Sequence, residues 1–128
     1  MTEPCTLPTP LDGDAAATLL RLLVVLAERG LVPFERPQEG DALWIGPAMA
    51  DWLRCDVSEL PRRLADLHDL VHADDLPFAA TRLAQPHSGE MLVGRLADGA
   101  GGWYRLHQTA RLLRLADGSG VVSGLWRV

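Results

Sequence analysis

The residues best suited to chemistry gather around two histidines, His68 and His72, which stand four positions apart and are followed by Asp74 and Asp75. Neutral imidazole is a good metal ligand, and His72 could also contact a haem or another bound group. No third or fourth ligand lies at a suitable spacing, so we expect no metal site here. We favour a simpler interpretation, in which these residues cap the start of a helix, because the helix dipole stabilises carboxylates there.

The chain has two cysteines, Cys5 and Cys55, which are too few for a disulfide framework or a zinc site. Cys55 could in principle be photoreactive or redox-active. Its neighbour Asp56 is acidic and no histidine is within reach in the sequence, so the thiolate is not favoured. We expect reduced thiols and a half-buried Cys55 without a chemical role.

No sequence motif supports catalysis. The chain lacks a Gly-rich phosphate loop, a Gly-x-Ser-x-Gly elbow and a Cys-His-Asn signature. The acidic residues Asp66, Asp69, Asp74 and Asp75 are typical of an exposed helix surface and helix caps rather than of a paired-carboxylate site. We therefore expect no catalytic residue and no enzymatic activity.

The elements that position these residues begin with a helix. Residues 15–29 contain no helix breaker, with Asp14 before them and Gly30 after them. Leucines and valines surround most of the circumference of this helix, so it needs cover on more than one side. We predict that a second copy of the chain supplies this cover, with the dimer interface at Leu19, Leu22, Leu23 and Leu26.

The rest of the chain predicts a hairpin, short helices and three further strands. We expect the hairpin at residues 31–36 and 41–46, helices at 47–54, at about 58–70 and from Asp74 or Asp75 to Pro86, and strands at 91–97, 103–115 and 121–128. Asp98-Gly99 and Asp117-Gly118 mark the turns between the last three strands. This order predicts an α+β domain built on an antiparallel sheet.

Five segments then follow one another in a familiar order. They are residues 31–44, residues 45–53, Val71-His72-Ala73-Asp74-Asp75, the pair Arg95-Leu96-Ala97-Asp98-Gly99 and Trp103-Tyr104-Arg105, and the pair Asp117-Gly118 and Gly124-Leu125-Trp126-Arg127. Together they resemble the motifs of the PAS sensory domain family, in the subgroup that has an HPDD-like signature and a DG…W hairpin. The resemblance covers residues 31–128. It implies a PAS-like five-stranded antiparallel sheet, with short helices on one face and an N-terminal flanking helix.

The resemblance also implies an interior cavity between the sheet and the short helices. If the side chains alternate regularly along the strands, the residues that point into it are Leu92, Leu106, Gln108, Ala110 and Val122. Gln108 is polar among apolar neighbours and needs a partner. We favour a filled core in which Gln108 bonds to backbone, and the alternative is a ligand pocket.

The chain departs from the family at several positions. Ala73 stands where the family prefers proline, and Arg54-Cys55 stands where a glycine and an aromatic residue commonly end the first short helix. Haem-binding members carry their axial histidine on the long helix, which has none here, and the flavin-binding Asn-Cys-Arg-Phe-Leu motif is absent. We expect that no cofactor is required, and expect neither haem nor flavin.

Length and charge limit the remaining function classes. The 128 residues suffice for one domain, and 17 acidic side chains against 12 arginines give a net charge of −5, which argues against a nucleic-acid partner. The longest apolar run, residues 22–27, is too short to span a membrane. Residues 1–89 hold 14 acids against 7 arginines, whereas residues 90–128 hold 3 against 5, an asymmetry that suits protein contact.

We therefore expect a flexible tail at residues 1–11, a flanking dimerisation helix at 12–30 and a PAS-like domain at 31–128. The resemblance implies a homodimeric sensor of a bacterial signal transduction or regulatory protein, which relays to an output domain or partner signalling protein. The family's Asp-Ile-Thr-like connector does not follow, so we expect the output domain to be absent from this chain. The start of the chain has no secretory signal, so we expect a cytoplasmic protein. The alternative function is a protein whose cavity binds a small molecule or cofactor.

Overall fold

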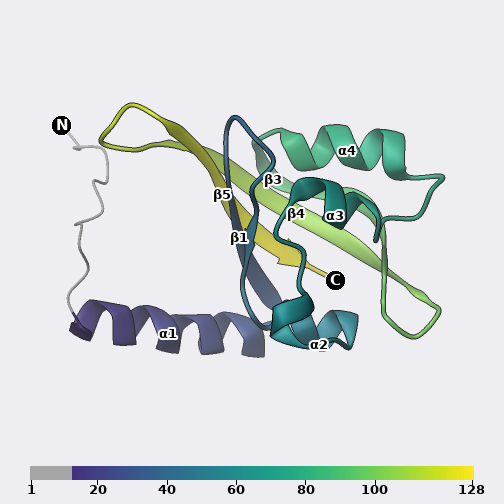
Figure 1. The fold of residues 1–128 in the computed structure, drawn as a ribbon, viewed down its shortest axis with the longest axis horizontal. Coiled ribbons are helices and arrows are strands. Elements are labelled where there is room, and N and C mark those ends of the chain that lie inside the picture. The colour runs from purple at the N-terminus through teal and green to yellow at the C-terminus, as the bar shows by residue number, and fades with distance from the viewer. Residues whose placement is uncertain (1–12) are drawn as a thin grey trace.

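The first long strand and the last strand of the chain pair with each other inside one antiparallel sheet (Figure 1). The computed structural model describes residues 13–128, so the tail expected at residues 1–11 lies outside the described residues, as does Cys5. The elements are α1 (Gly13–Glu28), β1 (Leu31–Pro37), β2 (Trp44–Ile45), α2 (Met49–Leu53), the 3-10 helix η1 (Val57–Glu59), α3 (Leu64–His68), α4 (Leu76–Ala84), β3 (His87–Ala97), β4 (Trp103–Arg114) and β5 (Gly120–Arg127). The strand order is β2-β1-β5-β4-β3. The expected five-stranded α+β fold is thereby confirmed.

The short helices and α1 occupy different parts of the molecule. Helices α3 and α4 lie beside one another over the sheet and α2 lies at the other end of it, whereas α1 leads into β1 through a two-residue connection (Figure 1). Gly30 in this connection has a φ of 72°, a left-handed conformation that ends the helix.

Alternation along the strands decides which side chains form the core. In β4, Leu106 and Ala110 are buried while Arg105 and Arg111 are exposed, because successive side chains point to opposite faces. In β5, Trp126 is buried and its ring stacks on Phe34 of β1 with a centroid separation of 4.3 Å. A Cβ at Gly124 would lie 2.1 Å from the carbonyl oxygen of Thr109, so the close packing at this point requires glycine.

The predicted boundaries between residues 41 and 70 are wrong in two respects. Strand β2 is limited to two residues, because Leu43 donates its N–H to the carbonyl of Arg62 (2.9 Å) and Leu64 donates to that of Asp41 (2.8 Å). The helix expected at about 58–70 is divided into η1 and α3, because the carbonyl of Arg62 and the N–H of Leu64 bond to residues 41–43 instead of within a helix. Leu60 between them is extended (φ −62°, ψ 143°), as a residue before proline prefers.

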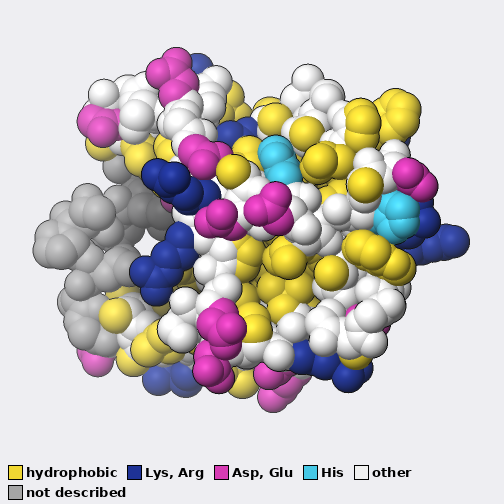
Figure 2. Space-filling view, turned by 45° about the vertical axis from the view of Figure 1, so that its right-hand side comes forward, with side chains coloured by type: hydrophobic (Ala, Val, Ile, Leu, Met, Phe, Trp, Pro, Cys, Tyr) yellow, Lys and Arg dark blue, Asp and Glu magenta, His cyan; other side chains and the backbone are white. Residues whose placement is uncertain are grey.

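The surface carries a mixture of side chains. Figure 2 shows acidic, basic and hydrophobic side chains interspersed on one face, without a continuous basic stripe. Among residues 13–128, no helix combines the length and apolarity that a membrane crossing needs.

Candidate functional site

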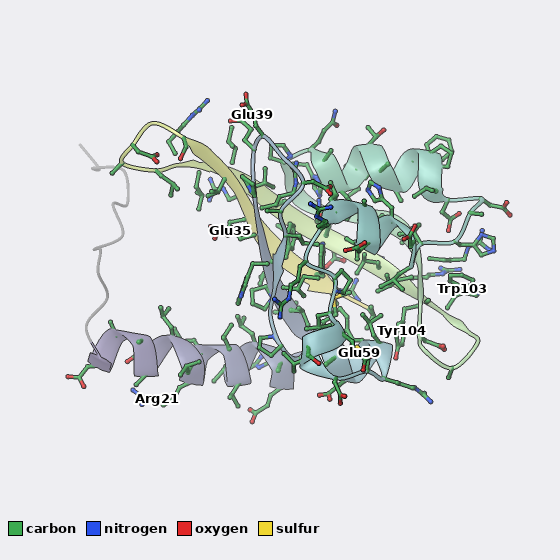
Figure 3. The ribbon with its side chains drawn as sticks, viewed as in Figure 1. Arg21, Glu35, Glu39, Glu59, Trp103 and Tyr104 are labelled. Carbon is green, nitrogen blue, oxygen red and sulfur yellow. The ribbon has the colours of Figure 1, made fainter. Side chains whose placement is uncertain are left out.

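The first candidate surface is the apolar side of α1. Five of its leucine and valine side chains are roughly half exposed or more, namely Leu19 (47%), Leu20 (65%), Leu22 (50%), Val24 (58%) and Val25 (50%). Of the four residues predicted for a dimer interface, Leu19 and Leu22 are exposed and Leu23 and Leu26 are half-buried. Arg21 on the same helix points away from the sheet (Figure 3). A helix with this much apolar surface in water is available to a partner.

The second candidate is the inner face of the sheet, where Gln108 of β4 is fully buried. Its Oε1 accepts a hydrogen bond from Nε1 of Trp126 (2.9 Å), and its Nε2 donates to the carbonyl oxygen of Arg82 in α4 (3.0 Å). The ring of His87 lies with Nε2 2.9 Å from the carbonyl oxygen of Gln108. One polar side chain therefore joins β4, β5 and α4.

The residues predicted to line a cavity divide into two groups. Leu106, Gln108, Ala110 and Val122 are buried on the inner face, and their role as ligand-pocket residues stays a prediction. The inward direction predicted for Leu92 is wrong, since this side chain is 41% exposed and Val93 takes the buried position. The reason is a pairing irregularity in β3 between Leu92 and Gly94, which breaks the regular alternation.

Sequence reasoning missed Arg36, the one charged side chain among the buried residues that the structure describes. It follows Val32 and Phe34 on the inner face of β1, and this two-residue spacing could have identified it. Its Nη1 donates to the carbonyl of Pro37 (3.3 Å) and its Nη2 to that of Ala84, the last residue of α4. Burial lowers the pKa of Arg36, and the carbonyl end of a helix is where a cation is favoured.

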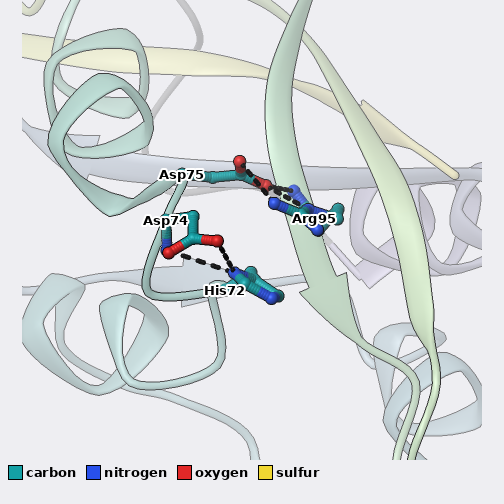
Figure 4. Close-up of polar contacts among 4 residues, drawn as sticks. All are labelled: His72, Asp74, Asp75 and Arg95. Carbon is teal, nitrogen blue, oxygen red and sulfur yellow. Dashed lines mark hydrogen bonds and ion pairs between the residues drawn. The ribbon is translucent and has the colours of Figure 1, made fainter.

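The loop before α4 binds the edge of β3 (Figure 4). Oδ2 of Asp75 accepts hydrogen bonds from the backbone N–H (2.9 Å) and Nε (2.8 Å) of Arg95, and its Oδ1 accepts one from Nη2 (3.1 Å). These bonds lower the pKa of Asp75 to about 2. The predicted cap is therefore wrong for Asp75, whose side chain makes no cap bond to α4 and binds a strand instead.

His72 contributes to the same loop through local contacts. Its Nδ1 accepts a hydrogen bond from the N–H of Asp74 (3.1 Å), and its ring lies edge-on to Trp103 with a centroid separation of 4.7 Å. Trp103 belongs to the start of β4, as Figure 3 shows. Among the described residues, no group of three or more histidine, cysteine, aspartate or glutamate side chains is arranged to bind a metal.

Cys55 is half-buried, and its surroundings disfavour the thiolate. Burial raises the pKa of its thiol, and the nearby carboxylates of Glu59 and Asp56 raise it further. A thiol with a raised pKa is a poor nucleophile near neutral pH.

Hollows that open at the surface of the described residues include the following three. The first, about 410 Å³, is lined by Arg36 and Trp44 among others. The second, about 300 Å³, lies between β2 and residues 57–62. The third, about 420 Å³, lies between α4 and β3.

Comparisons with known proteins give matches to solved structures. No protein-family model matches the chain, and no curated protein matches it. The N-terminal domain of a diguanylate cyclase with a PAS/PAC sensor, from Marinobacter aquaeolei, superposes with a TM-score of 0.62 at 15% identity, covering 75% of this chain and 92% of that one. A sensory box histidine kinase/response regulator from Burkholderia thailandensis gives a TM-score of 0.58 at 14% identity, covering 83% of this chain and 82% of that one. The chain therefore has the fold of PAS/PAC sensor domains.

Proposed function

We propose that this protein is a signal-sensing and protein-interaction domain without catalytic activity, which forms a homodimer through α1 and relays a signal to an output domain or partner signalling protein. The observation that carries the proposal is the exposed apolar surface of α1. Leu19, Leu22, Leu23 and Leu26 follow the spacing of one stripe along a helix, so they can pack against the same stripe of a second copy.

Burial of the leucine stripe contributes favourable free energy to this pairing. Moving a half-exposed leucine side chain out of water contributes about 1 kcal/mol, so Leu19 and Leu22 on each of two copies contribute about 4 kcal/mol, to which the less exposed Leu23 and Leu26 add. Association costs roughly 4–15 kcal/mol, which places the expected dimer in a range where protein concentration matters.

The connection between α1 and the sheet supports a relay. Helix α1 is joined to β1 by Arg29 and Gly30 alone, and β1 pairs with β5 over seven residues from Leu31 to Pro37. Through Gln108 and Arg36, the same strands are hydrogen-bonded to the end of α4. A change in the position of α4 would therefore act on β1, which is joined to α1, and on its partner β5.

The alternative role, binding of a small molecule in the interior, has less support. Trp126, Phe34 and Gln108 already occupy the inner face, and both polar ends of the Gln108 amide are bonded. Native mass spectrometry of the purified protein separates the two functions, because a small molecule retained in stoichiometric amount would favour the binding role.

The dimer is tested by sedimentation equilibrium at about 50 µM, a concentration suited to a weak complex. We expect the unmodified chain to sediment as a dimer and the Leu22→Glu variant as a monomer, because a carboxylate in the apolar stripe opposes its burial. The matched control is Leu113→Glu, at an exposed leucine on β4 (44%), which should remain dimeric. A monomeric unmodified chain, or equal behaviour of the two variants, would refute the proposal.

A further inference from the structure

The hollow between α4 and the edge strand β3 is lined by arginines and exposed apolar side chains. Its volume is about 420 Å³. The lining residues are Asp75, Phe78 and Arg82 from α4 and its start, Leu92, Val93, Gly94 and Arg95 from β3, and Arg105 from β4. We refer to it as the arginine hollow.

The positive charge of the arginine hollow exceeds its negative charge. Arg95 and Arg105 are directly opposite each other in the β3–β4 ladder, an arrangement of like charges that is unfavourable unless it is compensated. Asp75 compensates Arg95, to which it is bound by three hydrogen bonds. Among residues 13–128, no carboxylate pairs with Arg105 or with Arg82.

Arg82 is nevertheless fixed in position. Its Nη1 donates to the carbonyl oxygen of Leu92 (2.8 Å), and its guanidinium carbon lies 5.7 Å from the centroid of the Phe78 ring. The remaining N–H groups of this guanidinium are free to bind a carboxylate, the acceptor that its fork geometry matches best.

Apolar surface lies beside these cations. Phe78 is 65% exposed, the joint highest exposure among the large hydrophobic side chains described, and Leu92 is 41% exposed. Both line the arginine hollow. The hollow therefore offers exposed apolar surface to a large hydrophobic side chain and guanidinium groups to carboxylates.

Beside the arginine hollow, existing bonds oppose the addition of a strand to residues 92–97 of β3. The carbonyl of Arg95 accepts from the N–H of His72, the N–H of Arg95 is bound to Asp75, and the N–H of Ala97 is bound to the carbonyl of Leu70. The carbonyl of Leu92 is bound to Arg82. An occupant must therefore bind through side chains rather than by extending the sheet.

We propose that the arginine hollow binds an acidic segment of a partner protein that carries a large apolar side chain. Carboxylates of the segment pair with Arg82 and Arg105, and its apolar side chain packs against Phe78 and Leu92. A protein segment fits better than a nucleic acid, because the exposed Phe78 and Leu92 beside the arginines suit an apolar side chain, which a phosphate chain does not supply. This site is separate from α1, so it adds a second interaction surface to the proposed function.

The test uses the full chain and fluorescein-labelled peptides, with binding measured by fluorescence anisotropy. The probe is a peptide of alternating glutamate and aspartate with a central phenylalanine. Two control peptides replace the acids by lysine or the phenylalanine by alanine. We expect the acidic phenylalanine peptide to bind, the alanine peptide to bind more weakly, and the lysine peptide not to bind.

Variants assign the binding to the arginine hollow. Arg105→Glu should weaken binding of the acidic peptide by about tenfold or more, because it replaces attraction by repulsion. The matched control Arg111→Glu changes an exposed arginine on the same face of β4 and should alter the affinity less than about twofold. Leu22→Glu should leave peptide binding unchanged, which separates this site from the dimer interface.

Several results would overturn the proposal. They are absence of peptide binding at millimolar concentration, equal weakening by Arg105→Glu and Arg111→Glu, or equal binding of the lysine peptide. Binding of a single-stranded oligonucleotide or phosphatidylserine vesicles in place of the peptide, with loss in Arg105→Glu, would also overturn it and reassign the hollow.

Discussion

Arg54, at the end of α2, has a left-handed backbone (φ 55°, ψ 46°), alone among the described residues other than glycine in having a positive φ. This conformation brings Cβ close to the backbone carbonyl oxygen and costs roughly 1 kcal/mol for most residues, but almost nothing for glycine. The sequence resemblance placed a glycine at this position in related domains, and the backbone now gives the reason.

We predict that Arg54→Gly raises the free energy of unfolding by about 0.5–1 kcal/mol, measured by urea denaturation. The control is Arg54→Ala, which removes the same charged side chain but keeps the Cβ and should give no such gain. If the two variants have the same stability, the backbone strain at Arg54 does not contribute.

At the scale of elements, α4 is attached to the sheet by polar bonds as well as by the packing of its buried Ala79 and Leu83. Gln108 binds the carbonyl of Arg82, Arg36 binds that of Ala84, and Asp75 binds Arg95. Such bonds break and re-form at defined positions, whereas apolar packing has no comparable directionality. In the proposed relay, α4 is therefore the element whose movement the bonded strands would follow.

We predict that Gln108→Leu lowers the free energy of unfolding by about 2–4 kcal/mol, because it leaves the N–H of Trp126 and the carbonyl of Arg82 buried without partners. The neighbouring Thr109→Val, on the other face of β4, is the control and should change stability by less than about 1 kcal/mol. Thermal and urea denaturation provide the measurement. Equal effects of both substitutions would contradict a structural role for the amide.

The sequence predicted those elements whose pattern is local. Alternation in β4 and the Asp-Gly turns at Asp98 and Asp117 gave the last three strands, and the breaker-free stretch before Gly30 gave α1. These signals depend on neighbours in the chain, so a single sequence contains them.

Contacts between distant residues could not be predicted in this way. Asp75 and Arg95 are 20 positions apart, and Leu43 pairs with Arg62 only because the fold brings them together. Leu92 points outward because of an irregularity in strand pairing, and the residues next to it in the sequence do not predict this irregularity. The arginine hollow, which combines α4, β3 and β4, was for the same reason beyond sequence reasoning.

For the whole molecule, acid stability depends on carboxylates that are bonded in the folded state. The pKa of Asp75 is lowered by its hydrogen bonds to Arg95, that of Glu90 by Arg127, and that of Asp98 by the N–H groups of Ala100 and Gly102. A carboxylate with a lowered folded-state pKa stabilises the protein above its unfolded pKa, and this contribution is lost as the pH falls through the folded value.

For Asp75 the window runs from its ordinary pKa of 3.8 down to about 2. We predict that stability decreases over this range and that Asp75→Asn makes the decrease shallower, because one titrating group is removed. Urea denaturation at a series of pH values measures both slopes. The control Asp66→Asn, on an exposed side chain of α3, should leave the profile unchanged. Identical profiles for all three proteins would contradict the assignment.

Residues 70–75 have a further consequence for how copies of the chain can associate. They cover the backbone of β3 at one edge of the sheet, and at the other edge β2 is only two residues long. Long uncovered edges are what allow folded β-proteins to polymerise into fibres. Because residues 95–97 of β3 are already bonded and β2 is short, these parts of the sheet edges offer little backbone for pairing with another strand, and the proposed association through α1 would form a symmetric pair rather than a growing sheet.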